Sequence, residues 1–351
     1  MLFLLDLPPE EYARCDKDTL ARTVTELLRA NDRGHHIVVI DRRGVEWLTS
    51  HLSLNDWESA SLRRIELAYS QRGGLATEAR IYVKLTIDDN GIERSKEQTA
   101  FRRSFKTILL GNYLNPSQLF VEDGIHDGDM YKFIMENLAD RFNVPYVKLE
   151  VLHGGGDRTS SMAIERAKDS YVVACIVDSD RRAPTQPEPS KVRSARASPK
   201  VAGSLFIIEA TPCRELENML PLELLQNLQS FIKNPTGGYL RRIDEYELTH
   251  NLEEKFYFYF DLKEGITPPN AETKGKSHSD GWLATRLESA LGGSVASLVG
   301  FGPNIISQII NSNKLCSDLR PLIRSPSWIA VFGSFIRSLI WIFSATRPVV
   351  T

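Results

Sequence analysis

The chain has 351 residues, of which 42% are hydrophobic and 25% are charged. This is about twice the ~150 residues of an average domain, so one elaborated domain or two packed domains with a sizeable core are expected. The composition excludes disordered, collagenous and disulfide-stapled proteins. Lysine and arginine total 43 against 45 acidic residues, and the net charge of −2 gives no overall positive field. A nucleic-acid partner would therefore have to be held by local basic patches.

The cysteine pattern and the N-terminal segment indicate a cytoplasmic protein. The chain has four cysteines: Cys15, Cys175, Cys213 and Cys316. They are far apart and form no CxxC or Cys/His pairing, which argues against structural zinc and against a disulfide framework. The segment 1–12 has no basic region, and acidic residues and prolines interrupt it too early for a signal peptide, so we interpret it as mature sequence.

The first 112 residues predict an accessory α/β region. Apolar residues recur at helical spacing in 18–31, and a break at Gly34 is followed by a short β-like run at 36–40. A second helix is expected at 55–71 and a strand at 79–87, which ends in a turn rich in Asp, Asn and Gly.

Residues 113–265 predict the core of the protein. Strands and helices alternate in LFVE (119–122), MYKFIMENLADRF (130–142), YVKLEVL (146–152), SSMAIERA (160–167), YVVACIVDSD (171–180) and SLFIIEA (204–210). This alternation predicts right-handed βαβ units around a buried parallel sheet flanked by helices. A helix from about Arg214 to 232 and a β-like run at 255–262 follow, and the C-terminal region 266–351 is expected to be mostly helical.

A basic segment, 181–200, interrupts this pattern with four prolines and six lysine or arginine residues against one glutamate. Its composition predicts a long, mobile loop. Because it directly follows Asp180, its cations could neutralise a nucleic-acid backbone; a solvated loop is the alternative. The candidate nucleic-acid-binding residues are Arg181, Arg182, Arg193, Arg196 and, at the start of the helix expected after 204–210, Arg214.

The apolar segment 328–343 near the end of the sequence spans 16 residues and is interrupted by Arg337. This is shorter than the ~20 apolar residues of a membrane-spanning helix. A buried or partner-facing helix and no stable membrane association are expected, with membrane attachment as the alternative.

Acidic residues follow predicted strands at two places in the core. Glu122 ends the first strand, and Asp178 and Asp180 end a later one. Open α/β sheets bind ligands at the carboxyl ends of their strands, so these side chains are expected to converge, together with Glu217 from the helix after 204–210.

Clustered carboxylates repel one another, and a folded protein offsets this by protonating them or by binding a cation. Oxygen ligands without cysteine or histidine suit Mg²⁺ or Mn²⁺, which take further ligands from water and substrate phosphate. The pattern therefore predicts a site for phosphoryl chemistry. A DxD pair can also be a solvated turn, and the acids after Glu122 can simply favour a helix N-terminus.

In this order, the motifs resemble the Toprim fold, and within it the Toprim nuclease domain of the overcoming-lysogenization-defect (OLD) nucleases and related bacterial antiviral effectors. The resemblance rests on FVEDGIHDGDMYKFI (120–134), VLHGGGDRTSSMAI (151–164), CIVDSD (175–180) and CRELENMLP (213–221), and it extends to 265 through YFDLKEG (259–265). It implies a Toprim-like parallel-sheet core and a metal-dependent endonuclease that cuts DNA or RNA, such as tRNA, in antiphage defence.

The resemblance assigns catalytic and metal-binding roles residue by residue. Glu122 is similar to the first-motif glutamate, as a metal ligand or general base. Asp178 and Asp180 match the DxD pair, and Glu217 matches the acid of the Arg-x-Leu-Glu-Asn signature. These carboxylates would position the metal ions directly or through water.

Three further residues have open roles. Asp127 is a candidate metal ligand five residues after Glu122, whereas the commoner motif is Glu-Gly-x-x-Asp. Lys263 could stabilise charge on the scissile phosphate or be a surface lysine. Arg214 could contact phosphate or hold Glu217 through a charge-assisted hydrogen bond.

The glycine run HGGGD (153–157) could cradle a phosphate or form a tight turn between a strand and a helix. It lacks the GxxxxGK[ST] pattern, and no Walker lysine follows, so we predict a tight turn and no ATPase in this chain.

The function predicted by this combination is a metal-dependent nuclease. Toprim proteins also include primases and topoisomerases, and the fold alone does not choose among them. The Cys₄ zinc modules that primases and many topoisomerases append are missing here, whereas a nuclease needs only metals and a base. OLD enzymes carry an ATPase, so a separate ATPase or sensor subunit is an expected partner, besides nucleic acid and a second copy of the chain. The alternative is a non-catalytic Toprim-like module that binds nucleic acid or a partner.

Overall fold

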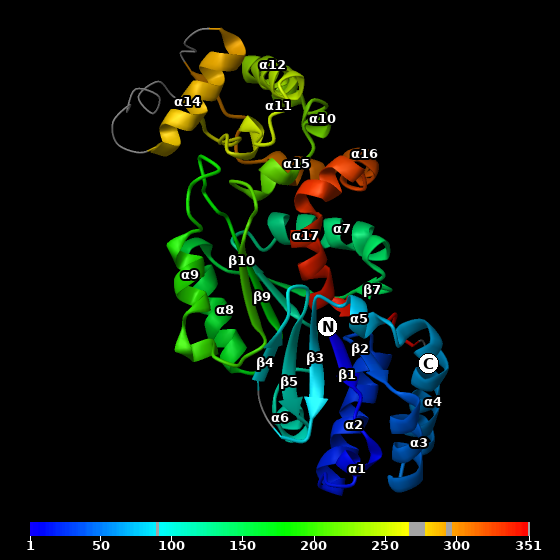
Figure 1. Cartoon of the computed structure of the whole chain (residues 1–351). Coiled ribbons are helices and arrows are strands. Elements are labelled where there is room, and N and C mark those ends of the chain that lie inside the picture. The colour runs from blue at the N-terminus through cyan, green and yellow to red at the C-terminus, as the bar shows by residue number, and fades with distance from the viewer. Residues whose placement is uncertain (89–90, 267–277, 293–296, 350–351) are drawn as a thin grey trace.

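The computed structural model describes residues 1–88, 91–266, 278–292 and 297–349. Two parallel β-sheets with their helices form two halves of the protein, and helices from the C-terminal third pack over the second half (Figure 1). The mixed α/β class expected from the sequence is confirmed. The first sheet lies within 1–112 and the second within 113–265.

The first sheet has five strands in the order β2-β1-β3-β5-β4, all parallel except β4, which is antiparallel to β5. Its strands are β1 (Leu2–Leu5), β2 (Ile37–Ile40), β3 (Ile81–Thr86), β4 (Gly91–Arg94) and β5 (Thr99–Ser104). Its helices are α1 (Pro9–Tyr12), α2 (Lys17–Asp32), α3 (Arg42–His51), α4 (Asp56–Arg72), α5 (Leu75–Glu78) and α6 (Phe105–Leu110). The helices predicted at 18–31 and 55–71 are confirmed as α2 and α4. The buried strand β1 was not predicted.

The second sheet has four parallel strands in the order β10-β9-β6-β8. They are β6 (Gln118–Val121), β8 (Glu150–His153), β9 (Val173–Val177) and β10 (Phe206–Ala210). The helices that connect them are α7 (His126–Leu138), followed by η1 (Ala139–Phe142), then η2 (Gly156–Arg158) with α8 (Thr159–Lys168), and α9 (Ser190–Arg196). Strand β9 is buried along its whole length because it has a strand on each side and helices over its faces.

The strand order of the second sheet reverses between β6 and β9. From β6 the chain moves outward to β8, and it then crosses back to β9 and β10 on the other side of β6. In doubly wound sheets, a ligand crevice opens at the carboxyl ends of the strands at such a reversal. Glu122 and Asp178 directly follow these two strands, so the topology places both acids at the same point.

Three predictions for this half are wrong. The helix expected from about Arg214 is divided into three short pieces, and Pro221 separates the first from the second because proline interrupts a helix begun before it. These pieces are η4 (Leu216–Met219), α10 (Leu222–Leu225) and α11 (Gln229–Ile232). The β-like run 255–262 contains the 3₁₀ turn η5 (Phe256–Phe258) and buries most of its aromatic rings. The segment 181–200 contains α9 and η3 (Pro199–Val201), and two apolar residues of α9, Val192 and Ala195, are buried.

The C-terminal region is mostly helical in its described residues, as expected. Helix α12 (Pro235–Thr249) precedes this region. The helices within it are α14 (His278–Leu291), α15 (Ile305–Ile310), α16 (Asn313–Ile323) and α17 (Pro326–Ile342). Two short antiparallel pairs join β11 (Gly265–Ile266) to β12 (Leu298–Val299), and β13 (Ser344–Ala345) to β7 (Tyr146–Val147).

Helix α17, drawn in red in Figure 1, contacts β3 of the first sheet and α7 of the second. Its inner side chains, including Ile336 and Trp341, are fully buried, which confirms the buried helix expected at 328–343. The guanidinium of Arg337 within this helix donates a hydrogen bond to the backbone oxygen of Glu78 at 3.0 Å. In the described ranges, no single helix is long and apolar enough to cross a membrane; α16 and α17 pass such a test only as a pair bent by 91°.

Candidate functional site

Acidic residues from four separate segments meet at the carboxyl end of the second sheet. Glu122 follows β6, Asp178 follows β9, Asp127 lies in the first turn of α7, and Glu217 lies in η4. The negative charges of Glu217 and Glu122 act on Asp178, and that of Glu217 acts on Asp127. The convergence predicted from the sequence is therefore present.

The carboxylate cluster, defined as Glu122, Asp127, Asp178 and Glu217, is electrostatically strained. Burial raises the pKa of Asp178 well above its usual value, and the charges of Glu217 and Glu122 raise it further. Burial raises the pKa of Asp127 to about 7, with a further contribution from Glu217. The side chain of Glu217 is only 3% exposed, and burial raises its pKa as well. The cluster therefore has less positive charge than its carboxylates require for full ionisation.

Two ammonium groups offset part of this charge. Nζ of Lys263 lies 3.2 Å from Oε1 of Glu217 and 3.1 Å from Oε2 of Glu215. Nζ of Lys191, on α9, lies 2.7 Å from Oε1 of Glu122. Burial alone would lower the pKa of each lysine, but the neighbouring carboxylates outweigh it and raise the pKa of both. Both lysines are therefore charged counterions of the cluster, and Lys263 is not a free surface lysine.

Arg214 forms ion pairs with Asp261 and Glu215 beside the cluster, and not with the predicted partner Glu217. Its guanidinium is buried and lies 2.6 Å from Oδ2 of Asp261, with Nε 3.4 Å from Oε1 of Glu215. The acid predicted for it, Glu217, is instead bound by Lys263. Arg214 therefore stabilises the loop that carries Glu217.

The turn that carries Glu217 is fixed by buried hydrogen bonds. The amide of Asn218, which is fully buried, donates to the backbone oxygens of Tyr257 at 2.7 Å and Phe260 at 2.9 Å. The hydroxyl of Tyr257 donates to the backbone oxygen of Glu217 at 3.0 Å, and the indole of Trp328 donates to that of Met219 at 2.7 Å. Segments 40 or more residues away along the chain therefore position Glu217.

Asp180 lies at the rim of the cluster. It is exposed and has a left-handed backbone conformation with φ of 53°, which aspartate tolerates better than most residues. Its backbone N–H donates to the oxygen of Arg214 at 3.0 Å, and its negative charge acts on Lys191. Between the two aspartates, Ser179 is buried and bonded to Thr211 and Cys213, which ties the end of β9 to the loop after β10.

Asp123 and Asp127, two acids that follow Glu122, have different roles in the structure. Oδ1 of Asp123 accepts from the backbone N–H groups of Ile125 at 2.9 Å and His126 at 3.3 Å, so Asp123 stabilises the turn that leads into α7, whose N-cap residue is Ile125. Gly124 passes so close to His153 that a Cβ there would lie 2.8 Å from His153 atoms. The alternative of a helix N-terminus therefore describes Asp123, whereas Asp127 belongs to the cluster.

The glycine run after β8 forms the predicted tight turn. Gly155 and Gly156 have φ of 72° and 65°, which other residues rarely adopt. The backbone N–H of Gly154 donates to the oxygen of Val121 at 2.8 Å, so it already has a partner. These contacts explain the glycines without a bound phosphate.

The predicted nucleic-acid-binding arginines differ in what they contact. Arg181 donates to the backbone oxygen of Pro212, and Arg196 pairs with Glu188 at 2.8 Å and Glu209 at 2.6 Å. Arg193 is exposed on α9, and Arg182 is exposed and lines a pocket. Much of the charge of the basic segment is therefore used within the chain.

The carboxylate cluster has the donor atoms that a hard metal ion prefers, but its side chains are not arranged around a metal-binding position. Within the described ranges, no group of three or more His, Cys, Asp or Glu side chains is arranged to hold a metal ion. The carboxylate cluster nevertheless offers only oxygen donors, and three of its acids have raised pKa values from burial and mutual repulsion. A hard divalent cation would relieve that repulsion.

Sequence reasoning missed three residues of the site. Glu215 and Asp261 each stand two positions before a residue that was predicted, Glu217 and Lys263. Lys191 was counted only among the charges of the basic segment. The recurrence of charged residues within RELEN and FDLKEG is the signal that could have found the first two.

Comparisons with protein-family models, with curated proteins and with solved structures give no match to this chain. The chemistry of the cluster is therefore inferred from its own geometry and charges.

Proposed function

We propose that this protein is a metal-dependent nuclease with a Toprim-like core, which hydrolyses phosphodiester bonds of DNA or RNA at the carboxylate cluster. One observation carries the proposal: Glu122 and Asp178 end neighbouring parallel strands at the strand-order reversal and are joined there by Asp127 and Glu217. A set of oxygen donors with unrelieved repulsion suits Mg²⁺ or Mn²⁺ and, through them, phosphate.

In this proposal, the four carboxylates hold two Mg²⁺ or Mn²⁺ ions, and Asp180 at the rim binds directly or through water. Such ions, when bound, supply a hydroxide nucleophile and stabilise charge on the phosphate. Carboxylates must be ionised to act as metal ligands, so the raised pKa values of Asp127 and Asp178 predict that metal binding would be accompanied by proton release.

Two side chains act on the reacting groups directly. Lys263 remains protonated between Glu215 and Glu217, so its ammonium can stabilise the negative charge that develops on the scissile phosphate. Glu122 is 28% exposed and therefore accessible to water. As the alternative to its role as a metal ligand, it could accept a proton from the attacking water after its ion pair with Lys191 is broken.

The test is cleavage of plasmid DNA, single-stranded DNA and total tRNA in Mg²⁺, Mn²⁺ or EDTA. The variant is Asp178→Asn, which keeps the side-chain shape but removes the charge. Asp129→Asn is the matched control, because Asp129 is exposed on the same side of the sheet in the first turn of α7.

We expect metal-dependent cleavage by the wild type and by Asp129→Asn, and a loss of roughly 100-fold or more in Asp178→Asn, comparable to removing one catalytic donor. Cleavage that persists in EDTA or in Asp178→Asn would contradict the proposal. The substrate that is cut decides between DNA and RNA.

The ion pairs of Lys191 and Lys263 with the carboxylate cluster favour a second function. If these pairs are permanent, the cluster stabilises the fold and does not bind metal. The chain would then be a non-catalytic module that binds nucleic acid or a partner. Nucleic-acid binding that persists in EDTA, with none of the three substrates cut, would support this alternative.

The resemblance noted above extends the proposal to antiphage defence, with a separate ATPase or sensor subunit and a second copy of the chain as partners. Cells expressing the wild type should resist phage plating, and cells expressing Asp178→Asn should not. Light scattering of the purified protein tests the dimer, and co-purification tests the ATPase subunit.

A further inference from the structure

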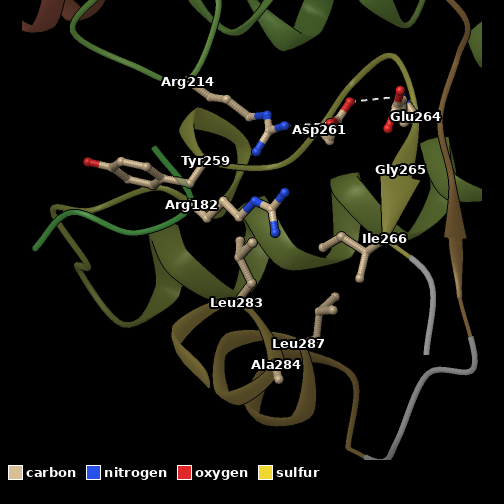
Figure 2. A pocket seen from close by; sticks show the side chains of 10 residues that line it. All are labelled: Arg182, Arg214, Tyr259, Asp261, Glu264, Gly265, Ile266, Leu283, Ala284 and Leu287. Carbon is tan, nitrogen blue, oxygen red and sulfur yellow. Dashed lines mark hydrogen bonds and ion pairs between the residues drawn. The ribbon is translucent and has the colours of Figure 1, made fainter. Parts of the chain in front are cut away.

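A pocket opens beside the carboxylate cluster, between the loop after η5 and helix α14 (Figure 2). One wall is apolar and is made by Ile266 and by Leu283 and Leu287 of α14. Figure 2 shows the guanidinium groups of Arg182 and Arg214 on the other side of the pocket. The pocket therefore combines an apolar face with charged hydrogen-bonding groups.

The pocket and the cluster share one stretch of chain. Asp261 and Glu264 line the pocket, and Lys263 between them reaches Glu217 of the cluster at 3.2 Å. Arg214 lines the pocket through the group that pairs with Asp261 at 2.6 Å, and its Nε lies 3.4 Å from Glu215. A ligand held in the pocket would therefore contact Asp261 and Glu264, which flank Lys263 in the sequence, and Arg214, which lies beside Glu215.

Nucleobases match this combination of surfaces. Each base has a π face that packs on apolar side chains or on a guanidinium plane, and an edge of hydrogen-bond donors and acceptors. We infer that this pocket binds a nucleobase of the strand that is cut at the carboxylate cluster. This inference rests on the proposed nuclease function and adds a specificity site to it.

The charged groups of the pocket favour guanine. Guanine presents O6 and N7 as acceptors, which suit arginine, and its N1–H and N2–H donors suit a carboxylate. Glu264 is exposed at the pocket, and its backbone N–H, not its carboxylate, donates to Oδ1 of Asp261 at 2.8 Å. Its carboxylate can therefore accept from the guanine edge while Arg182 donates to the acceptor atoms.

The experiment measures binding without cleavage. GMP, dGMP, AMP, CMP and UMP are titrated into the full chain in EDTA by calorimetry, with ribose 5-phosphate as the probe that lacks a base. Ala284→Phe fills the pocket from α14 without removing a core side chain. Thr285→Phe is its matched control, because Thr285 is exposed on the same helix and does not line the pocket.

We expect GMP to bind roughly tenfold or more tightly than ribose 5-phosphate and AMP, as one bidentate base contact provides. Ala284→Phe should abolish this difference, Thr285→Phe should keep it, and Glu264→Gln should reduce the preference for GMP over AMP. The ratio of GMP to dGMP binding reports whether the site favours RNA or DNA.

The inference is overturned if no nucleotide binds better than ribose 5-phosphate, or if Ala284→Phe binds GMP as the wild type does. Should Ala284→Phe not fold by circular dichroism, an unchanged GMP preference in Glu264→Gln overturns the guanine assignment. Because EDTA prevents metal-dependent cleavage, failure here is distinct from failure of the nuclease, which is tested through Asp178→Asn with metal.

Discussion

Nζ of Lys191 lies 2.7 Å from Oε1 of Glu122, so the basic segment 181–200 reaches into the carboxylate cluster. Helix α9 carries this lysine and is anchored to the sheet by the buried Val192 and Ala195. Lys191 is therefore a counterion of the acid at the end of β6, at the position where a divalent cation would bind. If the carboxylate cluster binds a metal ion as proposed, that ion and Lys191 would compete for the carboxylate of Glu122.

Replacement of Lys191 should strengthen metal binding. Lys191→Gln removes the ammonium that pairs with Glu122, and a partly exposed ion pair contributes up to ~1 kcal/mol, so the affinity for Mn²⁺ should rise roughly two- to fivefold. Electron paramagnetic resonance of free Mn²⁺ measures this. Arg193→Gln, an exposed change on the same helix, should have no effect; unchanged or weaker binding in Lys191→Gln would contradict the competition.

The metal-free protein should lose stability as the pH rises. Asp127 ionises near pH 7 in the folded protein but near its ordinary pKa of 3.8 when unfolded, so the folded state binds more protons between these values. The free energy of unfolding in EDTA should therefore fall from about pH 4 to pH 8. Each pKa unit corresponds to about 1.4 kcal/mol, so the difference between 3.8 and about 7 sets an upper limit of ~4 kcal/mol. Asp127→Asn should therefore be roughly 1–4 kcal/mol more stable than wild type at pH 8.

Urea unfolding at pH 5 and pH 8 checks this prediction. Asp129→Asn, an exposed change in the same turn of α7, should keep the pH dependence of the wild type. If Asp127→Asn keeps it too, Asp127 does not carry a raised pKa.

Loss of the Asn218 amide should destabilise the turn that carries Glu217. Asn218→Ala leaves the buried backbone oxygens of Tyr257 and Phe260 without their donor. The expected cost is roughly 2–4 kcal/mol of unfolding free energy, as for other buried polar groups that lose partners. Chemical denaturation measures it, with the exposed Asn227→Ala as control; a cost near that of the control would show that the turn is held by other contacts.

Helix α17 should couple the two halves of the protein. Ile336 is fully buried in this helix, which contacts both β3 and α7. Ile336→Ala should cost roughly 2–5 kcal/mol through lost burial and the cavity left behind. Unfolding followed by circular dichroism and tryptophan fluorescence should shift together, whereas Val331→Ala, at a 49% exposed position of the same helix, should shift neither. Two separate transitions would indicate that the halves unfold independently.

Local sequence patterns were sufficient for much of the fold. Helical spacing of apolar residues predicted α2, and the alternation of strands and helices after residue 113 predicted α7, α8 and a buried parallel sheet that includes the strand before Asp178. The acids after β6 and β9 could be predicted to meet because the carboxyl ends of parallel strands lie at one edge of a sheet. The break at Pro221 could have been predicted, because proline interrupts a helix that begins before it. The run of aromatic residues in 255–262 is compatible with more than one local structure, so its 3₁₀ turn could not.

The sequence by itself indicated three acids of the cluster, because Glu122 and Asp178 follow strands and Glu217 lies in a recognisable motif. The role of Asp127 was open, and the structure places Asp180 at the rim. Only the tertiary structure decided what surrounds these acids. It set the reversal of strand order between β6 and β9 and the pairing of Lys191 with Glu122. It also paired Arg214 with Asp261 and Glu215 and not with Glu217, the partner expected from the sequence. Arg214 and Asp261 are 47 residues apart in the sequence, and Lys191 and Glu122 are 69 residues apart. Such pairs leave no local periodicity, because the free energy of an ion pair depends on burial and distance, which are set only when the sheet and its helices have packed.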